Sequence, residues 1–373
     1  MLARQAYEDV LRKIYVEPTT RCNLNCLTCV RNVWQEPLGT MEWPVFETLI
    51  EGLKDFPEAR TMSISGSGEP LLHPRLTDMV RLAHERGLRT EVTSNGLLLT
   101  RELVLALLDA GLDQFVVSID GIGENQGEIR PDAPLETIIR NVKMFYKHYD
   151  QKARPAVRIG ISFVAMKRNI RYLPALRQVA TRIGASFILV SNFLPHEEHL
   201  RNEVLYHVRA TALENPGRPW VPLWMLPFMD WNDHTSDALA KMLRLQPNLS
   251  ILDFDLNERK NYCPFIQGQS TSVAWNGMIS PCLPLMHSYP CYTMGRKKDI
   301  RAYGVGNLQK QDLPSIWKNP EYEAFRRRVH VFRFPACTDC ICHLQESNET
   351  DCDGNPFPVC GDCLWARGIL RCP

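Results

Sequence analysis

Three cysteines near the start of the chain are spaced for iron chemistry. Cys22, Cys26 and Cys29 form a CxxxCxxC pattern directly after a short apolar run. A [4Fe–4S] cluster normally takes four cysteine ligands. Three thiolates on one tight loop would leave one iron without a protein ligand, and that iron could bind a small chelating molecule. Two alternatives are a zinc site completed by a distant residue and three unrelated thiols of the core.

The other ten of the 13 cysteines lie between residues 263 and 372. Cys263 and Cys282 have the spacing C-x13-G-x4-C, and the intervening Asn276-Gly277 is a strong hairpin signal. A hairpin there would bring the two thiols together. The remaining cysteines are Cys291, Cys337, Cys340, Cys342, Cys352, Cys360, Cys363 and Cys372. A chain of this length needs no disulfides to hold its core, so we expect clustered thiols that bind metal in a reducing compartment.

The charge balance excludes some classes of partner. The chain holds 43 Lys and Arg against 42 Asp and Glu, a net charge of +1, and its composition is that of a globular protein. Near-neutrality disfavours charge-driven binding to nucleic acid or to an anionic membrane, so we expect neither partner. There is no apolar run long enough to span a membrane and no apolar signal core near residue 1, which predicts a cytoplasmic protein.

Short β-branched runs alternate with amphipathic helical patterns between residues 14 and 190. The predicted strands cover residues 14–18, 61–65, 89–93, 115–119, 157–163 and 186–190. Such alternation predicts βαβ units and a parallel sheet. Six units are too few for a closed eight-fold barrel, so the expected fold is α/β, a partial (β/α)6 TIM-like barrel over residues 1–190. Residues 191–262 are interpreted as a linker, and 263–373 as a small cysteine-rich domain that needs metal to fix it.

Polar or glycine-rich segments follow the second, third and fourth predicted strands. They contain Gly66, Gly68 and Glu69, then Ser94 and Asn95, then Ser118 and Asp120, with Arg130 further on. Each segment alone is typical of a simple turn. In βα barrels, however, the chemistry lies at the carboxyl ends of the strands, and all of these groups are predicted to reach that face. Together they are candidates for binding a ligand beside the first cysteine cluster.

At this point the chain resembles the radical S-adenosylmethionine enzymes, over roughly residues 14–190. The resemblance implies that the three N-terminal cysteines hold a [4Fe–4S] cluster whose open iron binds S-adenosylmethionine, and that cluster reduction releases a 5′-deoxyadenosyl radical. It implies that the segment ending in Glu69 meets the methionine amino group. It also implies that Ser94-Asn95 and Ser118 lie near the ribose and that Arg130 approaches the carboxylate. Thr28 departs from the family, in which an aromatic residue often precedes the third cysteine.

The C-terminal cysteines resemble the SPASM-type extension of that family, which binds one or two auxiliary Fe–S clusters. The ligands that this resemblance implies are Cys263, Cys282, Cys337, Cys340, Cys342, Cys352, Cys360 and Cys363, with Cys291 and Cys372 left as spare core thiols. The family continues C-x2-C-x5-C-x3-C, whereas here Cys342 comes too early and Cys352 too late for the third position. A four-cysteine zinc or rubredoxin-like site built from the pairs 337/340 and 360/363 is the alternative.

Two segments, residues 280–289 and 346–373, look like those of maturases found with tungsten-containing aldehyde:ferredoxin-type oxidoreductases. This similarity implies a protein, peptide or cofactor substrate, possibly a tungsten oxidoreductase, and a low-potential electron donor such as ferredoxin or flavodoxin. A maturase that makes thioether or carbon–carbon links in a peptide is the second hypothesis. A third, from another class, is a zinc-ribbon scaffold on an inactive barrel.

Two further features receive a structural interpretation. The basic runs 296–298 and 326–328 are expected to be solvated faces. His287 and His343 lie near cysteines, but a histidine in that position is more often structural than a ligand.

Overall fold

The computed structural model describes residues 7–147, 157–206, 262–335, 337 and 346–372. The strands are β1 (Lys13–Val16), β2 (Thr61–Ile64), β3 (Arg89–Ser94), β4 (Gln114–Ser118), β5 (Arg158–Ala165), β6 (Phe187–Asn192), β7 (Ser270–Val273), β8 (Met278–Ser280), β9 (Tyr289–Thr293), β10 (Arg296–Ile300) and β11 (Gly306–Asn307). The helices are α1 (Trp43–Gly52), α2 (Leu76–Glu85), α3 (Arg101–Asp109), α4 (Glu124–Ile129), α5 (Leu135–Val142), α6 (Met144–Lys147), α7 (Leu176–Ile183), α10 (Pro264–Gln267), α11 (Leu313–Trp317) and α12 (Pro320–His330).

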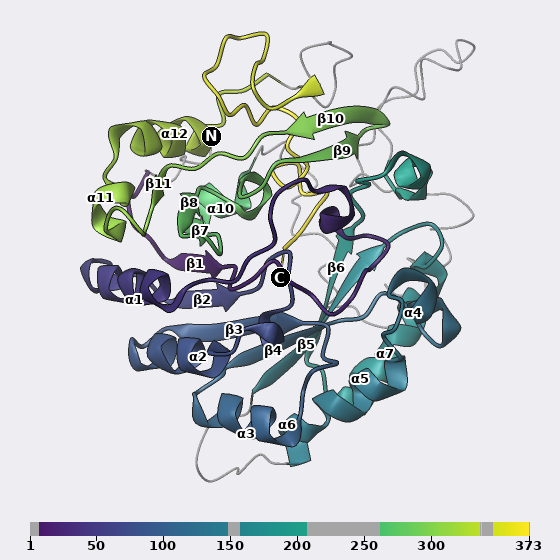
Figure 1. Ribbon diagram of the computed structural model, residues 1–373. Helices are drawn as coiled ribbons and strands as arrows, with labels where there is room; N and C mark the ends of the chain where they lie inside the picture. Colours follow the sequence, from purple (N-terminus) through teal and green to yellow (C-terminus); the bar gives the residue numbers. More distant parts are fainter. Residues whose placement is uncertain (1–6, 148–156, 207–261, 336, 338–345, 373) are drawn as a thin grey trace, which may run out of the picture.

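Strands β1 to β6 form a parallel sheet in chain order, as predicted. Helices α1, α2, α3, α5 and α7 lie on its outer side (Figure 1). The expected partial barrel is therefore confirmed. Its helix boundaries follow local chemistry: the Thr100 hydroxyl accepts the Leu103 N–H at the start of α3, a cap that is worth about 1 kcal/mol. Gly111, with φ +88°, follows the end of that helix.

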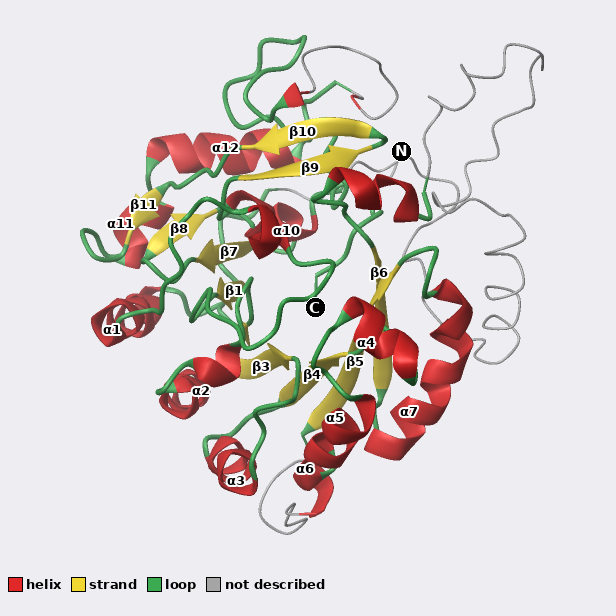
Figure 2. Ribbon diagram, turned by 45° about the vertical axis from the view of Figure 1, so that its right-hand side comes forward, coloured by secondary structure: helices red, strands yellow, loops and turns green. Residues whose placement is uncertain are grey.

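The C-terminal part continues the same sheet. Strand β7 pairs in parallel with β1, and β8 returns antiparallel to β7 through Asn276-Gly277, the predicted hairpin. Gly277 has φ +81°, a conformation that favours glycine. The full order is β11-β8-β7-β1-β2-β3-β4-β5-β6, while β9 and β10 form a separate ribbon that lies near α12 (Figure 2). One apolar core runs from the barrel into this part, because Ile14 and Phe325 belong to the same buried cluster.

The last described residues return to the open edge of the barrel. The Asn192 side chain donates to the Ile369 carbonyl at 3.0 Å, and the Arg371 N–H donates to the Ser191 hydroxyl at 3.0 Å. Figure 1 shows the C-terminal end of the chain among the strands of the barrel. The cysteine-rich part therefore contacts the barrel at two strands, β1 and β6, which are the first and last strands of the barrel sheet.

The expectation of solvated basic runs is wrong for two residues. Arg326 is buried on α12, where its guanidinium pairs with Asp9 at 2.8 Å and lies over the ring of Trp317. Lys298 is buried on β10 and pairs with both oxygens of Asp362. Both positions were misjudged because a run of like charges says nothing about which member of a strand or helix turns inward.

Some predicted features lie outside the described residues. They are most of the linker, together with His343, Cys340 and Cys342.

Candidate active site

The N-terminal thiols lie on the loop that follows β1. Each is partly exposed, and each has a donor beside its sulfur. The Leu24 N–H approaches the Cys22 Sγ at 3.4 Å, Arg31 Nε approaches the Cys29 Sγ at 3.3 Å, and Arg130 Nη1 approaches the Cys26 Sγ at 3.8 Å. Two guanidinium groups therefore flank the three sulfurs. Positive charge beside a thiol favours its thiolate, which is the form that binds metal.

The thiols are close enough to influence one another. Burial raises the pKa of Cys26 to about 11; Arg130 opposes this rise, and the nearby thiols of Cys29 and Cys22 add to it. Burial also raises the pKa of Cys22, against the effects of the Leu24 N–H and Arg31. Grouped thiols with raised pKa values are a donor set that a cationic cluster would deprotonate, because metal displaces the proton. The three thiols of the loop thus fit an iron–sulfur cluster. The loops that follow β2 and β3 lie next to them.

The glycine-rich segment after β2 packs directly against this loop. Gly66 has φ +132°, and a Cβ added there would lie 2.5 Å from the Cγ of Glu17. A Cβ at Gly68 would lie 2.2 Å from the Thr19 carbonyl oxygen. Only glycine permits such an approach, because these distances are far below van der Waals contact. The sequence signal at Gly66 and Gly68 therefore marks a close backbone approach to the end of β1.

Glu69 fastens three loops together. Its backbone N–H donates to the Arg21 carbonyl at 2.8 Å, and its carboxylate accepts the Leu71 N–H at 3.0 Å and the Asn95 N–H at 2.8 Å. Burial raises its pKa, although the two N–H donors oppose this. The Asn95 side chain continues the connection by donating to the Asn23 Oδ1 at 2.8 Å. Glu69 and Asn95 thus link β2 and β3 to the cysteine loop, a positioning role that the sequence did not indicate.

Asp120 and Arg130, which were predicted as separate candidates, form one unit. Asp120 is fully buried; one of its oxygens accepts the Arg130 Nε–H at 2.7 Å and the other accepts the Val164 N–H at 2.8 Å. Burial would lower the pKa of Arg130, but Asp120 raises it above the ordinary value, so the guanidinium stays charged. Asp120 therefore aims a permanent cation at Cys26.

The two predicted serines lie on the same face. The Ser94 hydroxyl accepts the Gly96 N–H at 2.9 Å at the end of β3. Ser118 ends β4, is half-buried, and lies opposite Ser162 of β5. All eight predicted ligand-binding residues thus lie at or beyond the carboxyl ends of β2, β3 and β4.

Sequence reasoning missed two residues here, Arg31 and Glu17. Arg31 also donates to the Leu24 carbonyl at 2.8 Å, so it braces the cysteine loop. Glu17, buried at the end of β1, accepts the Ser67 N–H at 3.0 Å. The same carboxylate pairs with His287 of the C-terminal part at 2.8 Å. The only sequence signal for Glu17 was its place at the end of an apolar strand. A charge that is buried there requires a partner.

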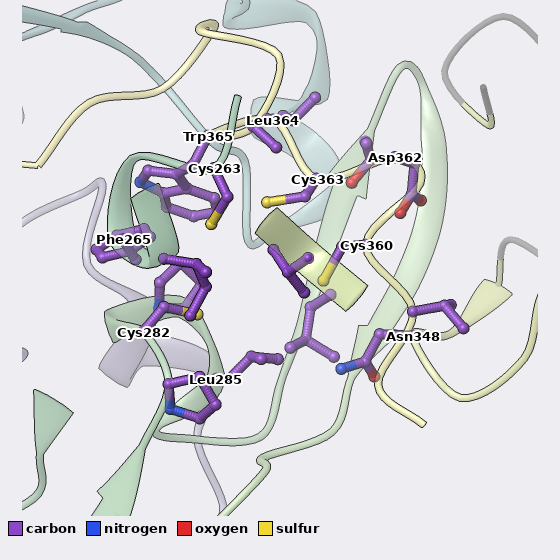
Figure 3. Close-up of a pocket in the computed structure, with 18 of the residues that line it drawn as sticks. Cys263, Phe265, Cys282, Leu285, Asn348, Cys360, Asp362, Cys363, Leu364 and Trp365 are labelled. Carbon is purple, nitrogen blue, oxygen red and sulfur yellow. The ribbon is translucent and has the colours of Figure 1, made fainter. Parts of the chain in front are cut away.

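A second group of thiols faces a cavity in the C-terminal part (Figure 3). Cys263, Cys282, Cys360 and Cys363 line it, with Cys291 in its wall. The other walls are largely apolar, from residues such as Phe265, Leu285, Ile300, Phe325, Val329 and Phe332. The hairpin of β7 and β8 brings the first pair of thiols together, as predicted, and the chain after residue 359 adds the second pair.

These four thiols also influence one another. Burial raises the pKa of Cys263 to about 12, with a further contribution from Cys363. The pKa of Cys282 is raised well above its usual value, first by burial and then by Cys263, Cys363 and Cys360. Four mutually close cysteines around a cavity are the donor set of a fully ligated Fe–S cluster or of a four-cysteine zinc site. Among the residues that the structure describes, no three His, Cys, Asp or Glu side chains converge in a way that could hold a single metal ion.

Cys337 and Cys352 are not among the residues that line this cavity. Burial raises the pKa of Cys337 to about 12, and Asp362, Cys352 and Asp351 add to this rise. Cys337 packs against the segment between Cys360 and Cys363, since a Cβ at Gly361 would lie 2.7 Å from its sulfur. Cys337 therefore lies beside the segment that carries Cys360 and Cys363, but it does not line the cavity that those two share with the hairpin cysteines.

The comparisons with known proteins agree with this geometry. Residues 16–161 match the model of the Radical SAM superfamily, and residues 263–341 match SPASM, an iron-sulfur cluster-binding domain. The chain is therefore a radical S-adenosylmethionine enzyme with a SPASM domain. Its cofactors are a [4Fe–4S] cluster, S-adenosylmethionine and auxiliary Fe–S.

One relative is similar over nearly the whole chain. It is the tungsten-containing aldehyde ferredoxin oxidoreductase cofactor-modifying protein of Pyrococcus furiosus, 29% identical over 97% of each chain. The Fe-coproporphyrin III synthase of Methanosarcina barkeri is 29% identical over 80% of this chain and 71% of its own.

Solved structures share the fold at low sequence identity. Native anSMEcpe with bound AdoMet has a TM-score of 0.59 at 14% identity over 96% of each chain. Streptococcus suis SuiB bound to S-adenosylmethionine has a TM-score of 0.58 at 14% identity, over 91% of this chain and 72% of its own.

No helix in the described ranges combines the length and apolar character that crossing a bilayer requires.

Proposed function

We propose that this enzyme cleaves S-adenosylmethionine reductively at a cluster held by Cys22, Cys26 and Cys29, and modifies the cofactor of a tungsten-containing oxidoreductase. The observation that carries the first half is the group of three thiols between Arg31 and Arg130, with one side turned to the glycine-rich loop. When bound and reduced, the cluster supplies the electron that breaks the sulfonium and frees a 5′-deoxyadenosyl radical. The second half rests on similarity to the Pyrococcus furiosus protein along 97% of both chains.

The protein's own residues supply orientation. Gly66 and Gly68 let this loop pack against the end of β1, which places its backbone beside the cysteine loop for an amino group, and Glu69 adds negative charge behind it. Ser94, Asn95 and Ser118 offer hydroxyl and amide groups for a ribose. The Asp120–Arg130 pair presents a fixed cation for a carboxylate. This division follows the charges of the ligand, whose amino, ribose and carboxylate groups need different partners.

For the auxiliary site, we assign one cluster to the four cavity thiols of Cys263, Cys282, Cys360 and Cys363. Complete ligation by protein, with apolar walls, suits electron transfer more than substrate binding. Cys337, Cys340, Cys342 and Cys352 remain as ligands of a second cluster. This assignment disfavours the four-cysteine zinc site built from the pairs 337/340 and 360/363, because it already uses Cys360 and Cys363 as cluster ligands.

A peptide substrate is the second candidate, since SuiB was crystallised with its precursor peptide SuiA. That similarity is in fold alone, at 15% identity. The electron donor we propose is a ferredoxin or flavodoxin in a reducing cytoplasm, where 13 cysteines stay free to bind metal. A zinc-ribbon scaffold would lack visible absorption.

The test is anaerobic purification with iron, sulfide and zinc counts, followed by dithionite and S-adenosylmethionine. We expect 5′-deoxyadenosine and a mass change in the cofactor of an added tungsten oxidoreductase. A colourless zinc protein would exclude the enzyme altogether. Nucleoside release with no change in the cofactor, but with a cross-link in an added peptide, would favour the second candidate.

A further inference from the structure

A histidine from the C-terminal part is held between two carboxylates of the barrel. His287 Nε2 pairs with Glu17 at 2.8 Å and His287 Nδ1 pairs with Glu36 at 2.7 Å. Glu17 comes from the end of β1, and Glu36 from the chain that follows the cysteine loop. His287 and Glu17 are both buried. Since ionised carboxylates only accept, both ring nitrogens must donate, so this arrangement requires an imidazolium.

Glu17 carries this contact to the glycine-rich loop. Its carboxylate accepts the Ser67 N–H at 3.0 Å, and its side-chain carbons fill the space beside Gly66 that a Cβ would occupy. One oxygen of Glu17 thus holds the loop, and the other holds His287. Any rotation of Glu17 to find a new partner would release Ser67 and open a gap beside Gly66.

On its other side, His287 contacts Trp34 and Glu36. These two residues belong to the segment that follows the cysteine loop, here called the tail of that loop. Glu36 accepts the Ser288 N–H at 2.7 Å in addition to its pair with His287. The Trp34 ring lies 4.3 Å from the His287 ring between centroids, tilted by 40°. His287 and Ser288 therefore hold this tail, while Glu17 holds the loop across from it.

We infer that His287 is a positioning residue for S-adenosylmethionine, through which the SPASM part of the chain fixes the glycine-rich loop and the tail of the cysteine loop. The inference rests on the proposed binding site at Gly66–Glu69. Removing the imidazolium leaves Glu17 as a buried charge with one partner fewer, which is costly and favours rotation of the side chain toward another donor. Such a rotation would release the Ser67 N–H.

The experiment uses reconstituted holoenzyme and two binding readouts that do not depend on turnover. One is the dissociation constant of S-adenosylmethionine from equilibrium dialysis. The other is the change that S-adenosylmethionine causes in the electron paramagnetic resonance signal of the reduced cluster. The variants are His287→Gln, Glu17→Gln and the double variant. Asp9→Asn is the matched control, because Asp9 also joins the barrel to the C-terminal part, through Arg326, but not at this loop.

We expect His287→Gln to keep its iron and to weaken S-adenosylmethionine binding by about 5- to 150-fold, the usual range for coupled sites. The spectral change should be reduced at equal nucleotide concentration. The double variant should weaken binding by less than the product of the two single effects, since it leaves no unpaired buried carboxylate. Asp9→Asn should bind like the unaltered enzyme.

Unchanged affinity and an unchanged spectrum in His287→Gln would overturn the inference, as would multiplicative single effects. Loss of iron in His287→Gln, or an equal loss of affinity in Asp9→Asn, would also overturn it, because the residue would then act on general structure. Failure of the unaltered holoenzyme to bind S-adenosylmethionine would instead reject the proposed function, so the two failures are distinguishable.

Discussion

The two thiol sites differ in number of sulfurs and in surroundings. The loop after β1 presents three thiols, two guanidinium groups and the polar ends of β2, β3 and β4. The C-terminal cavity presents four thiols, a fifth in its wall, and largely apolar side chains. Burial raises the pKa of Cys26 at the first site and of Cys263 at the second.

The comparison shows how one chain can use the same residue type, cysteine, at two sites with different surroundings. Three sulfurs with polar neighbours leave a coordination position and groups to orient a ligand, which is the requirement for chemistry. Under the proposed assignment, four sulfurs beside largely apolar walls would leave no coordination position open, which suits the storage or passage of electrons. The surroundings, more than the cysteines, set the role.

The largest effect should come from Cys26→Ala. Removing one of only three loop ligands should lower 5′-deoxyadenosine release under dithionite to the background rate, because the cluster loses its anchor beside Arg130. High-performance liquid chromatography of the nucleoside measures this. Cleavage at the native rate in this variant would contradict the assignment of the loop cluster.

Cys282→Ala should separate the two sites. We expect cofactor cleavage to persist, turnover of the protein or cofactor substrate to fall by at least about tenfold, and about four irons per chain to be lost, as for one cubane. Cys291→Ala is the matched control, because Cys291 lies in the same cavity wall and should keep all iron. Equal loss of cleavage and turnover in Cys282→Ala would mean that the sites do not divide their tasks.

Gly68→Ala tests the close approach of the ligand loop. The new methyl group would collide with the Thr19 carbonyl, so the loop must shift, and we expect S-adenosylmethionine affinity to fall by roughly tenfold or more. Gly127→Ala, in α4, has nothing within 4 Å and should stabilise the helix by about 0.5–1 kcal/mol without changing affinity. Calorimetric titration of both variants would decide, and equal affinities would remove the loop from the binding site.

The smallest effect is a pH dependence. Burial would lower the pKa of His287, but the hydrogen bonds that its ring nitrogens donate to Glu17 and Glu36 raise it to about 9. Because the folded-state pKa lies above the usual value near 6.5, the stabilisation is complete below that value and is lost as pH rises through about 9. Affinity for S-adenosylmethionine should therefore weaken above pH 9 in the unaltered enzyme by more than in His287→Gln. Parallel curves for the two proteins would show that another group titrates.

Much of the fold was predictable because its signals are local. All six predicted barrel strands are present within a few residues, since β-branched runs and the alternation with helices are written in adjacent positions. The Asn276-Gly277 turn likewise predicted the hairpin of β7 and β8. The addition of β7 to the edge of β1 was not predicted, because more than 250 residues separate the two strands and no local pattern records which edge accepts a distant strand.

The site shows the same division. The type and spacing of Cys22, Cys26 and Cys29 were enough to predict a loop for three-thiolate binding, because the three residues are neighbours in the chain. Tertiary structure alone decided that the pair 360/363 faces the hairpin cysteines, that Arg31 and Arg130 flank the loop thiols, and that His287 reaches Glu17. Those contacts depend on how distant segments pack, and burial then fixes which charges must find a partner.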